Sequence, residues 1–276
     1  MNPRLTSQSF LGETSDRILA RLRVAVVGLG GGGSHVAQQL AHLGVGHFVL
    51  FDPDYVEASN LNRLVGATAS DGDAKTKKTT VAERLIHGIN PDADVMLVTH
   101  PWQEAGVHLR DCDVVFGCVD SYSAREELER VCRRFLIPYI DHGMDVTKVI
   151  DRFVVSGQVI LSSPGELCMR CLGFLTEDLL AQEAAEYGAA GPRPQVVWPN
   201  GLLASAAVGM FVQLLTPCHR DHRMVEYLEY DGNAQTLNTS NRLAAVRGKE
   251  CPHFPTPLDL GDPFWPKPEP PQRCTK

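Results

Sequence analysis

Apolar residues in this chain fall into short runs separated by stretches with helical spacing. The first run, residues 23–28, ends at a cluster of glycines, and a helical pattern closed by Gly44 follows it. A second apolar run, residues 47–52, ends in the acidic residue Asp52. A strand, a glycine-rich turn, a helix and a second strand in this order predict a βαβ unit. Such units imply a parallel sheet with right-handed crossovers.

The alternation of strands and helices continues to about residue 145. We expect helices over 77–89 and 123–135, and strands over 94–99, 113–120 and 137–141. Beyond that point, residues 153–161 read as a strand of an antiparallel part of the sheet, and an apolar helix at 201–215 precedes an alternating strand at 224–232. Residues 176–200 show no regular pattern. The sequence therefore predicts an α/β, Rossmann-like fold, with a mostly parallel sheet, helices on both faces and an antiparallel C-terminal extension.

Composition and charge exclude several classes of protein. The 276 residues are 43% hydrophobic and 21% charged, which is ordinary for a soluble domain. The net charge of -7 argues against DNA or general nucleic-acid binding, because such proteins need a basic face. The N-terminus lacks the apolar core of a secretion signal, and the longest apolar run is shorter than the roughly 20 residues of a membrane span. With eight cysteines and no signal, we expect a cytoplasmic protein without a membrane partner.

The glycine-rich turn GLGGGG, residues 28–33, is the first indication of chemistry. Glycines between a strand and a helix let the backbone approach phosphates and direct free N–H groups and the helix dipole toward them. Asp52 lies where a ribose-binding carboxylate belongs. This unit alone leaves open an NAD-dependent oxidoreductase, an ATP-binding enzyme, and glycines that serve only a tight turn.

Residues downstream of this unit favour ATP. A dehydrogenase has no need for the polar run at 55–64 or for the lysine cluster at 75–78. An enzyme that cleaves ATP needs cations around the triphosphate and a carboxylate for Mg²⁺. Arg63, Lys77 and Asp120 are available for those tasks.

Four segments, in order, resemble the ThiF/MoeB family of adenylyltransferases, which includes the ubiquitin-activating enzymes. GLGGGG is similar to that family's GxGGxG loop, and FDPDYVEASNLNRL is similar to its segment of an acid followed by SNLNRQ. DAKTKKTTVAERLIHGINPD resembles its GKxKA…NP segment, and VVFGCVDSYSARE resembles its DxxDNxxxR strand end. The resemblance covers about residues 8–254, and several motifs in the right order make it far more specific than one motif alone.

This resemblance implies a role for each matching residue. Gly28, Gly30, Gly31 and Gly33 would hold the ATP phosphates, Asp52 would bind the ribose, Asn60 and Arg63 would contact the triphosphate, Lys77 would grip the phosphates, and Asp120 would hold Mg²⁺. Compared with the family's GKxKA…NP segment, this chain has one extra residue before Asn90. Lys75 and Lys78 therefore remain alternatives to Lys77 as the functional lysine.

Two positions depart from the family. Leu64 stands where the family has a glutamine. Ser7 stands where the family has an arginine that enters the ATP site of the partner subunit, and whether Arg4 replaces it stays open.

Cys168 and Cys171 form a CxxC pair, and Cys251 and His253 follow about 80 residues later. Two thiolates three residues apart can grip one Zn²⁺ from a single turn, and a distant second pair closes a tetrahedral site. The family's second pair is also CxxC, but Phe254 occupies the place of its last cysteine, so His253 is the natural fourth ligand. Reduced cysteines and a redox CxxC remain as alternatives.

The resemblance implies an enzyme that activates the C-terminal Gly-Gly carboxylate of a small ubiquitin-like or sulfur-carrier protein as an acyl-adenylate, with release of pyrophosphate. It also implies a homodimer, and a single domain over 1–276: an N-terminal helical arm (1–22), a nucleotide-binding half (23–145), a carrier-binding and zinc half (146–254) and a proline-rich tail (255–276). The loop before the apolar helix contains no cysteine, so we expect the chemistry to stop at the adenylate.

Three alternatives stay open at this level. One is a family member that acts like the tRNA threonylcarbamoyladenosine dehydratases, for which tRNA is the partner. The others are a non-catalytic partner-binding protein and, in a different class, an NAD-dependent oxidoreductase.

Overall fold

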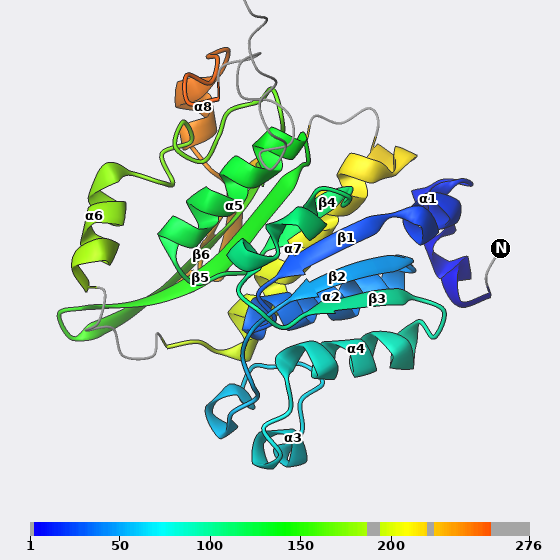
Figure 1. The fold of residues 1–276 in the computed structure, drawn as a ribbon. Coiled ribbons are helices and arrows are strands. Elements are labelled where there is room, and N and C mark those ends of the chain that lie inside the picture. Colours follow the sequence, from blue (N-terminus) through cyan, green and yellow to red (C-terminus); the bar gives the residue numbers. More distant parts are fainter. Residues whose placement is uncertain (1–2, 187–193, 220–223, 255–276) are drawn as a thin grey trace, which may run out of the picture.

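A single eight-stranded sheet organises the chain (Figure 1) in this computed structural model, which describes residues 3–186, 194–219 and 224–254. The strand order is β3-β2-β1-β4-β5-β6-β7-β8. The strands are β1 (Arg23–Val27), β2 (His47–Phe51), β3 (Asp94–Val98), β4 (Val114–Gly117), β5 (Tyr139–Val149), β6 (Arg152–Ser162), β7 (Tyr227–Asp231) and β8 (Thr236–Thr239). Strands β3 to β5 pair in parallel and β5 to β8 pair antiparallel. The predicted α/β, Rossmann-like fold class is therefore confirmed.

Helices cover both faces of the sheet (Figure 1). On one face, α2 (Gly31–Leu43), α4 (Lys78–Ile89) and α7 (Val197–Leu215) pack their apolar residues on the strands, and on the other face α5 (Tyr122–Phe135) does so. Shorter elements complete the chain: η1 (Pro3–Leu11), α1 (Ser15–Arg21), η2 (Ala58–Asn60), α3 (Ala69–Asp73), η3 (Trp102–Glu104), η4 (Gly106–Leu109), α6 (Glu177–Glu186), η5 (Pro217–His219) and α8 (Arg242–Val246). The proline-rich tail lies outside the described residues.

Strand order reverses between β1 and β4, because the chain runs outward from β1 to β3 and then returns to β4. In open α/β sheets the two crossovers diverge at such a point and leave a crevice at the carboxyl ends of the strands. The glycine-rich turn follows β1, and Asp120 follows β4. The fold thus brings two of the predicted segments to the same crevice.

Helix α7 begins at Val197, four residues earlier than the sequence pattern predicts. It is the one helix among the described residues that is long and apolar enough to cross a membrane by length and composition. It packs against α2, β5 and β6, and residues such as Leu203 and Phe211 are fully buried there. Most of its apolar residues therefore belong to the core, although Trp198 and Leu202 on it are exposed.

The expectation that residues 176–200 lack regular structure was wrong for their first part, which forms α6. The hydroxyl of Thr176 accepts a hydrogen bond from the N–H of Leu179 at 3.2 Å, and Glu177 and Asp178 lie in the first turn. A hydroxyl cap followed by acidic residues stabilises a helix N-terminus. This local signal explains where the helix starts.

Candidate functional site

A cavity of about 240 Å³ opens at the carboxyl ends of β1, β2 and β4. It is lined by residues from most of the predicted motifs, namely Gly28, Gly30, Gly31, Gly32, Asp52, Arg63, Lys78 and Asp120. Residues from the base of the β5–β6 hairpin, from α7 and from the segment just before α7 also line it, namely Gly143, Met144, Asp145, Gln158, Gln195 and Asn200. Motifs that are up to about ninety residues apart in the sequence therefore face one space.

The glycine turn is shaped by close approaches of the backbone. Gly28 has φ of +89°, and a Cβ there would lie 2.5 Å from the carbonyl oxygen of Cys118. A Cβ on Gly33 would lie 1.8 Å from the carbonyl oxygen of Gly28, and Gly33 does not line the cavity. Gly33 thus serves helix–strand packing, and Gly32 lines the cavity in its stead. Helix α2 begins at Gly31 without a side-chain cap, so its first N–H groups are available to an anion.

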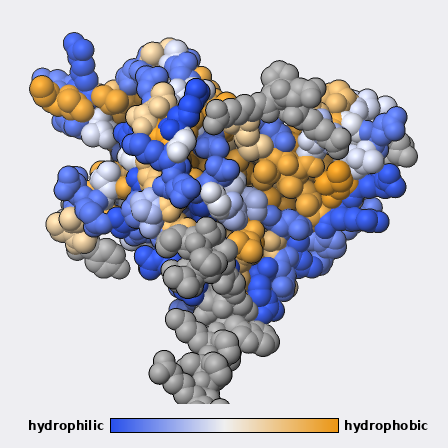
Figure 2. Space-filling model, turned by 90° about the horizontal axis from the view of Figure 1, so that it is seen from above, coloured by the Kyte–Doolittle hydropathy of each residue, from blue (hydrophilic) through white to orange (hydrophobic). Residues whose placement is uncertain are grey.

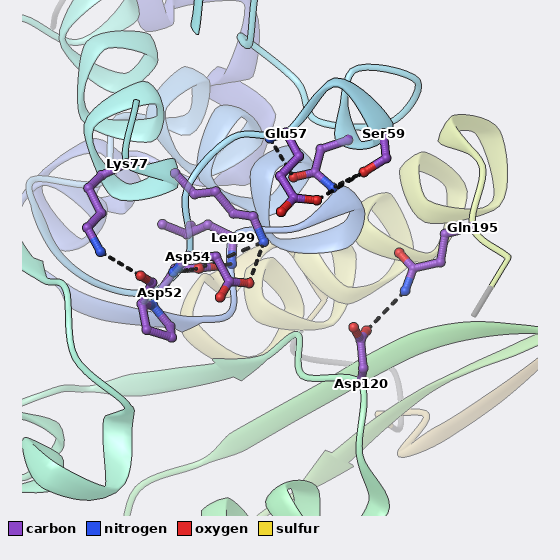
Figure 3. Close-up of polar contacts among 11 residues, drawn as sticks. Leu29, Asp52, Asp54, Glu57, Ser59, Lys77, Asp120 and Gln195 are labelled. Carbon is purple, nitrogen blue, oxygen red and sulfur yellow. Dashed lines mark hydrogen bonds and ion pairs between the residues drawn. The ribbon is translucent and has the colours of Figure 1, made fainter. Parts of the chain in front are cut away.

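Asp52 is held firmly at the end of β2 (Figure 3). One carboxylate oxygen accepts a hydrogen bond from the N–H of Leu29 at 2.7 Å, and the other accepts from the N–H of Asp54 at 2.8 Å. Burial raises the pKa of this carboxyl, while nearby Lys78 and the two N–H donors oppose that rise. These bonds fix the side chain beside the glycine turn, where a ribose hydroxyl can reach it.

The two neighbouring lysines point to different places. Lys78 Nζ lies 2.8 Å from a carboxylate oxygen of Asp54 and 3.9 Å from one of Asp52, inside the cavity. Lys77 Nζ donates to the carbonyl oxygen of Pro53 at 2.6 Å and lies 3.7 Å from the centre of the Tyr55 ring, outside the cavity lining (Figure 3). Lys77 is extended at the N-cap of α4, whereas Lys78 is the first helical residue, and this change of backbone separates the two side chains.

Arg63 lines the cavity and Asn60 does not. The guanidinium of Arg63 donates to the carbonyl oxygen of Ser59 at 2.8 Å and to the side-chain oxygen of Asn62 at 3.0 Å. The side-chain oxygen of Asn60 accepts from the N–H of Glu57 at 3.2 Å and caps the short helix η2. In this arrangement Asn60 shapes the loop that carries Arg63 and does not face the cavity.

Asp120 lies between β4 and α5 at the opposite wall of the cavity (Figure 3). Its Oδ1 accepts a hydrogen bond from Nε2 of Gln195 at 3.0 Å. The backbone carbonyl of Gln195 in turn accepts from the side chain of Asn62 at 3.2 Å. The segment that leads into α7 is thereby tied to both walls of the cavity, beside the carboxylate predicted to hold Mg²⁺.

A buried charged pair supports the floor of the cavity, and sequence reasoning did not assign it a role. The guanidinium of Arg125, on α5, donates to the carboxylate of Asp141, on β5, and Tyr139 donates its hydroxyl to the same carboxylate at 3.0 Å. Both charged residues are buried, and Arg125 lines the cavity. A signal was present for each residue by itself, since Asp141 ends the predicted strand 137–141 and Arg125 is the arginine of the VVFGCVDSYSARE segment.

His142 and Cys118 were also missed as cavity residues. Nδ1 of His142 lies 3.6 Å from Sγ of Cys118, and both residues line the cavity. Burial lowers the pKa of His142 to about 3, and it raises the pKa of the Cys118 thiol well above its usual range. The pair is therefore a neutral imidazole and a neutral thiol. A thiol without thiolate character is a poor nucleophile.

The four predicted metal ligands come together away from the residues that line the cavity. Cys168, Cys171, Cys251 and His253 each offer one ligand atom, and these atoms all lie within 4.8 Å of one another. The Sγ atoms of Cys168 and Cys171 are 3.6 Å apart, as are those of Cys171 and Cys251. Ligands at about 2.3 Å around one tetrahedral zinc ion are separated by roughly 3.8 Å. The cluster therefore has the composition and spacing that a zinc site requires.

The two residues that depart from the family's pattern lie in different surroundings. Leu64 is buried with Val56 and Val81 in a small cluster under the Arg63 loop, so packing explains why an apolar residue is accepted there. Ser7 is exposed on η1. The side chain of Arg4, the alternative to the family's arginine, lies outside the described part of the chain.

The sequence of this chain is similar to those of known proteins. The sequence model of the ThiF family matches residues 3–253. SAMP-activating enzyme E1 of Haloferax volcanii is 38% identical over 162 residues, which is 58% of this chain and 56% of that protein. Ubiquitin-like modifier-activating enzyme 5 of Dictyostelium discoideum is 32% identical over 171 residues, 56% of this chain and 42% of that protein. The matches thus span about half the length of these relatives.

Solved structures show the same fold. E. coli MccB in complex with ATP has a TM-score of 0.71 at 18% identity, covering 88% of this chain and 72% of that one. E. coli MccB with succinimide has a TM-score of 0.70 at 20% identity, with the same coverage. At this level of identity the likeness concerns the fold alone.

Proposed function

The chain belongs to the ThiF family, and from this premise we propose that it is an ATP-dependent adenylyltransferase. Its substrate is the C-terminal carboxylate of a small ubiquitin-like or sulfur-carrier protein, which becomes an acyl-adenylate while pyrophosphate is released. The relatives named for activating SAMP and ubiquitin-like modifiers support this class of substrate.

One observation carries the proposal. The uncapped N-terminus of α2, the fixed carboxylate of Asp52, the cations Arg63 and Lys78, and the carboxylate of Asp120 all line one cavity. A nicotinamide cofactor needs the first two features, but only a nucleotide that loses pyrophosphate needs two cations and a second acid. The combination supports Mg·ATP as the ligand.

Each residue then has a chemical task. Backbone N–H groups at the start of α2 bind phosphate oxygens, and Asp52 accepts a hydrogen bond from a ribose hydroxyl. The substrate carboxylate is already ionised at neutral pH, so it attacks the α-phosphorus without a general base. The bond to the leaving pyrophosphate breaks, and Arg63 and Lys78 stabilise the charge that develops there. Lys78 thus takes the task that the family resemblance assigned to Lys77.

Two groups of residues in the chain are suited to hold a metal ion each. Asp120 offers a carboxylate oxygen at the cavity wall, and a Mg²⁺ ion held there would supply further positive charge to the phosphates. The cluster of Cys168, Cys171, Cys251 and His253 fits a structural Zn²⁺. The exposed residues Trp198 and Leu202 on α7 support a homodimer, because a second copy would cover them.

Exchange of labelled pyrophosphate into ATP tests the proposal. The purified chain is assayed with Mg·ATP and each small protein ending in Gly-Gly from the same genome. We expect one carrier to drive exchange, loss of exchange when its last glycine is removed, and loss with Asp120→Ala. Exchange that survives Asp120→Ala, or no exchange with any of these carriers, would contradict the proposal.

A further inference from the structure

Two helices, α2 and α5, begin at the cavity, and their N-termini are in opposite states. No side chain caps the start of α2. At the start of α5, the N–H groups of Tyr122 and Ser123 donate to the two carboxylate oxygens of Glu183, at 2.8 and 2.9 Å. The next N–H, that of Ala124, donates to the hydroxyl of Ser121 at 3.2 Å. The kind of N–H group that is available to an anion at α2 is thus occupied at α5.

Glu183 reaches α5 from a separate part of the chain. It lies on α6, about sixty residues after the groups that it binds, and it is half-buried. Asp120 and Tyr122 line the cavity, whereas Glu183 does not. Glu183 therefore acts on the wall of the cavity through α5 and does not itself face a bound nucleotide.

Helix α6 is held against α5 at its other end as well. Arg170 donates to Glu126 on α5 and to Glu177, the first residue of α6. Figure 1 shows α6 beside α5, and hydrophilic surface predominates on the same side of the molecule in Figure 2. Four of the ten residues of α6 are acidic and none is basic. Polar contacts made by acidic side chains thus fix both ends of this helix.

An aromatic contact joins the same two segments. The centre of the Phe174 ring, in the loop before α6, lies 5.8 Å from the ring centre of Tyr122 and 5.9 Å from Cζ of Arg125. Both of these partners line the cavity, but Phe174 does not. Residues 170–183 therefore brace the start of α5 from outside the cavity, next to the turn that carries Asp120.

The charge of Glu183 matters because Asp120 stands at the positive end of α5, two positions before its first helical residue. A helix N-terminus carries about half a positive charge, which favours anions nearby and disfavours cations. The carboxylate of Glu183 lies on the N–H groups that carry this charge and offsets it. Arg125 adds a positive charge to the same turn, and Asp141 balances it. The surroundings of Asp120 are thereby suited to a cation.

We propose that Glu183 is a positioning residue that makes Asp120 a site for the Mg²⁺ of the nucleotide and closes α5 to phosphate. Its two hydrogen bonds fix the turn after β4, and its charge offsets the positive end of the helix. The phosphates are then directed to α2, whose N-terminus has no side-chain cap. This inference rests on the proposed function, because it concerns the metal that accompanies ATP in that cavity.

Formation of α5 does not by itself require this contact. Ser121 already supplies the usual hydroxyl cap, and Leu136 closes the other end of the helix in a left-handed conformation. A local capping box would place an acid at the third helical position, where Ala124 stands. The acid comes instead from α6, which ties the start of α5 to a second element.

Calorimetry on the full chain tests the proposal with α,β-methylene-ATP, which cannot be cleaved at the α-phosphorus, in the presence of Mg²⁺ or of EDTA. The ratio of the metal-free dissociation constant to that with Mg²⁺ measures how much the metal contributes to binding. Glu183→Gln removes a negative charge, so it should weaken the Mg²⁺ complex roughly two- to fivefold. The metal-free nucleotide should bind equally well or more tightly, because that ligand is an anion.

Two control variants separate charge from capping. Ser121→Ala removes the other cap of α5 without a change of charge, so it should lower the Tm and weaken both forms of the nucleotide alike. Asp178→Asn removes the same charge from the exposed first turn of α6 and should change the ratio less than about 1.5-fold. Equal weakening of both forms by Glu183→Gln, or an equal change of the ratio in Asp178→Asn, would overturn the proposal.

The failure of this inference and that of the proposed function are distinguishable. Asp120→Ala is the reference, because it removes the carboxylate itself and should reduce the ratio more than the other variants do. If it does so while Glu183→Gln leaves the ratio unchanged, the proposed function stands and the role of Glu183 is wrong. If the wild-type chain binds neither form, or if Asp120→Ala leaves the ratio unchanged, the proposed Mg·ATP site is wrong and this inference with it.

Discussion

Lys78 Nζ and a carboxylate oxygen of Asp54 lie 2.8 Å apart at the wall of the cavity beneath the glycine turn. The ion pair holds the lysine in place while leaving it within reach of bound phosphates. Its neighbour Lys77 is engaged with Pro53 and Tyr55 outside the cavity.

This arrangement predicts unequal effects of two adjacent substitutions. Lys78→Ala should lower pyrophosphate exchange by roughly 10- to 100-fold, because a hydrogen bond to a charged group is worth about 1.5–3 kcal/mol. Lys77→Ala, its matched control, should change the exchange rate less than about threefold, since it removes a surface contact. The test compares the pyrophosphate exchange rates of both variants at a saturating concentration of carrier. A larger loss for Lys77→Ala would reverse the assignment.

The sequence supplied most of the fold, because each central element carries its own local signal. The periodicity of residues 23–52 determined a strand, a turn and a helix in their correct order, and Asp52 at the end of β2 followed from it. The length of the β5–β6 hairpin could not be predicted in this way. Strand length there depends on cross-strand pairing over eleven residues, and exposed apolar residues give no pattern of burial.

The candidate site residues also divide into those with a local sequence signal and those whose position depends on packing. Gly28 and Asp120 follow strands whose pattern is local, and both line the cavity as their motifs suggested. Lys77 and Lys78 differ by one position, and only the start of α4 decides which of them faces the cavity. The sequence placed Arg125 in a motif and Asp141 at a strand end, but only the packing of α5 against β5 shows that Arg125 and His142 line the same cavity.

Acid should destabilise the protein through His142. Burial beside Arg125 lowers its pKa from 6.5 to about 3, so the folded protein leaves it neutral while the unfolded chain binds the proton. Its contribution is therefore complete above about pH 6.5 and is lost as the pH falls toward 3, with about 1.4 kcal/mol lost at pH 5.5.

Urea unfolding between pH 7.5 and 5.5 measures this loss. His142→Asn should flatten the dependence by about that amount. His35→Asn is the companion variant, because burial also lowers the pKa of His35 and its titration has the same sign. An unchanged pH dependence in His142→Asn would mean that the imidazole is protonated in the folded state.

The cysteine cluster should hold one zinc ion per chain. Arg133 and Glu129 on α5 already hold the backbone around Cys168, through Glu166, Leu167 and Met169. The ion adds the link to Cys251 and His253, which lie about eighty residues further along. Structural zinc contributes directly to folding.

Cys168→Ser should therefore lose the metal and lower the Tm by at least about 5 °C, at roughly 2–4 °C per kcal/mol for a chain of this size. Cys218→Ser is the control, since Cys218 lies outside the cluster. Elemental analysis and thermal unfolding measure both effects. Wild-type protein without zinc, and equally stable after chelation, would refute the assignment.

The acyl-adenylate should be the end product on the enzyme. Cys118 is the cysteine that lines the cavity among the described residues, and burial keeps it protonated. The loop at 187–196 contains no cysteine. A carrier incubated with the enzyme and Mg·ATP should accumulate as its adenylate, seen by mass spectrometry. A conjugate on a non-reducing gel that dithiothreitol releases would contradict this, and Cys118→Ser against Cys218→Ser would then locate the acceptor.

The identity of the nucleotide is the point on which every other step depends, and it can be measured without knowing the carrier. Titration calorimetry compares Mg·ATP with NAD⁺ on the full chain, and then on Arg63→Ala and Lys78→Ala. We predict submillimolar binding of Mg·ATP, little binding of NAD⁺, and roughly tenfold weaker Mg·ATP binding in each variant, as expected for one lost contact to a charged group. Tighter binding of NAD⁺ than of Mg·ATP, unaffected by these substitutions, would show that the cavity belongs to an oxidoreductase.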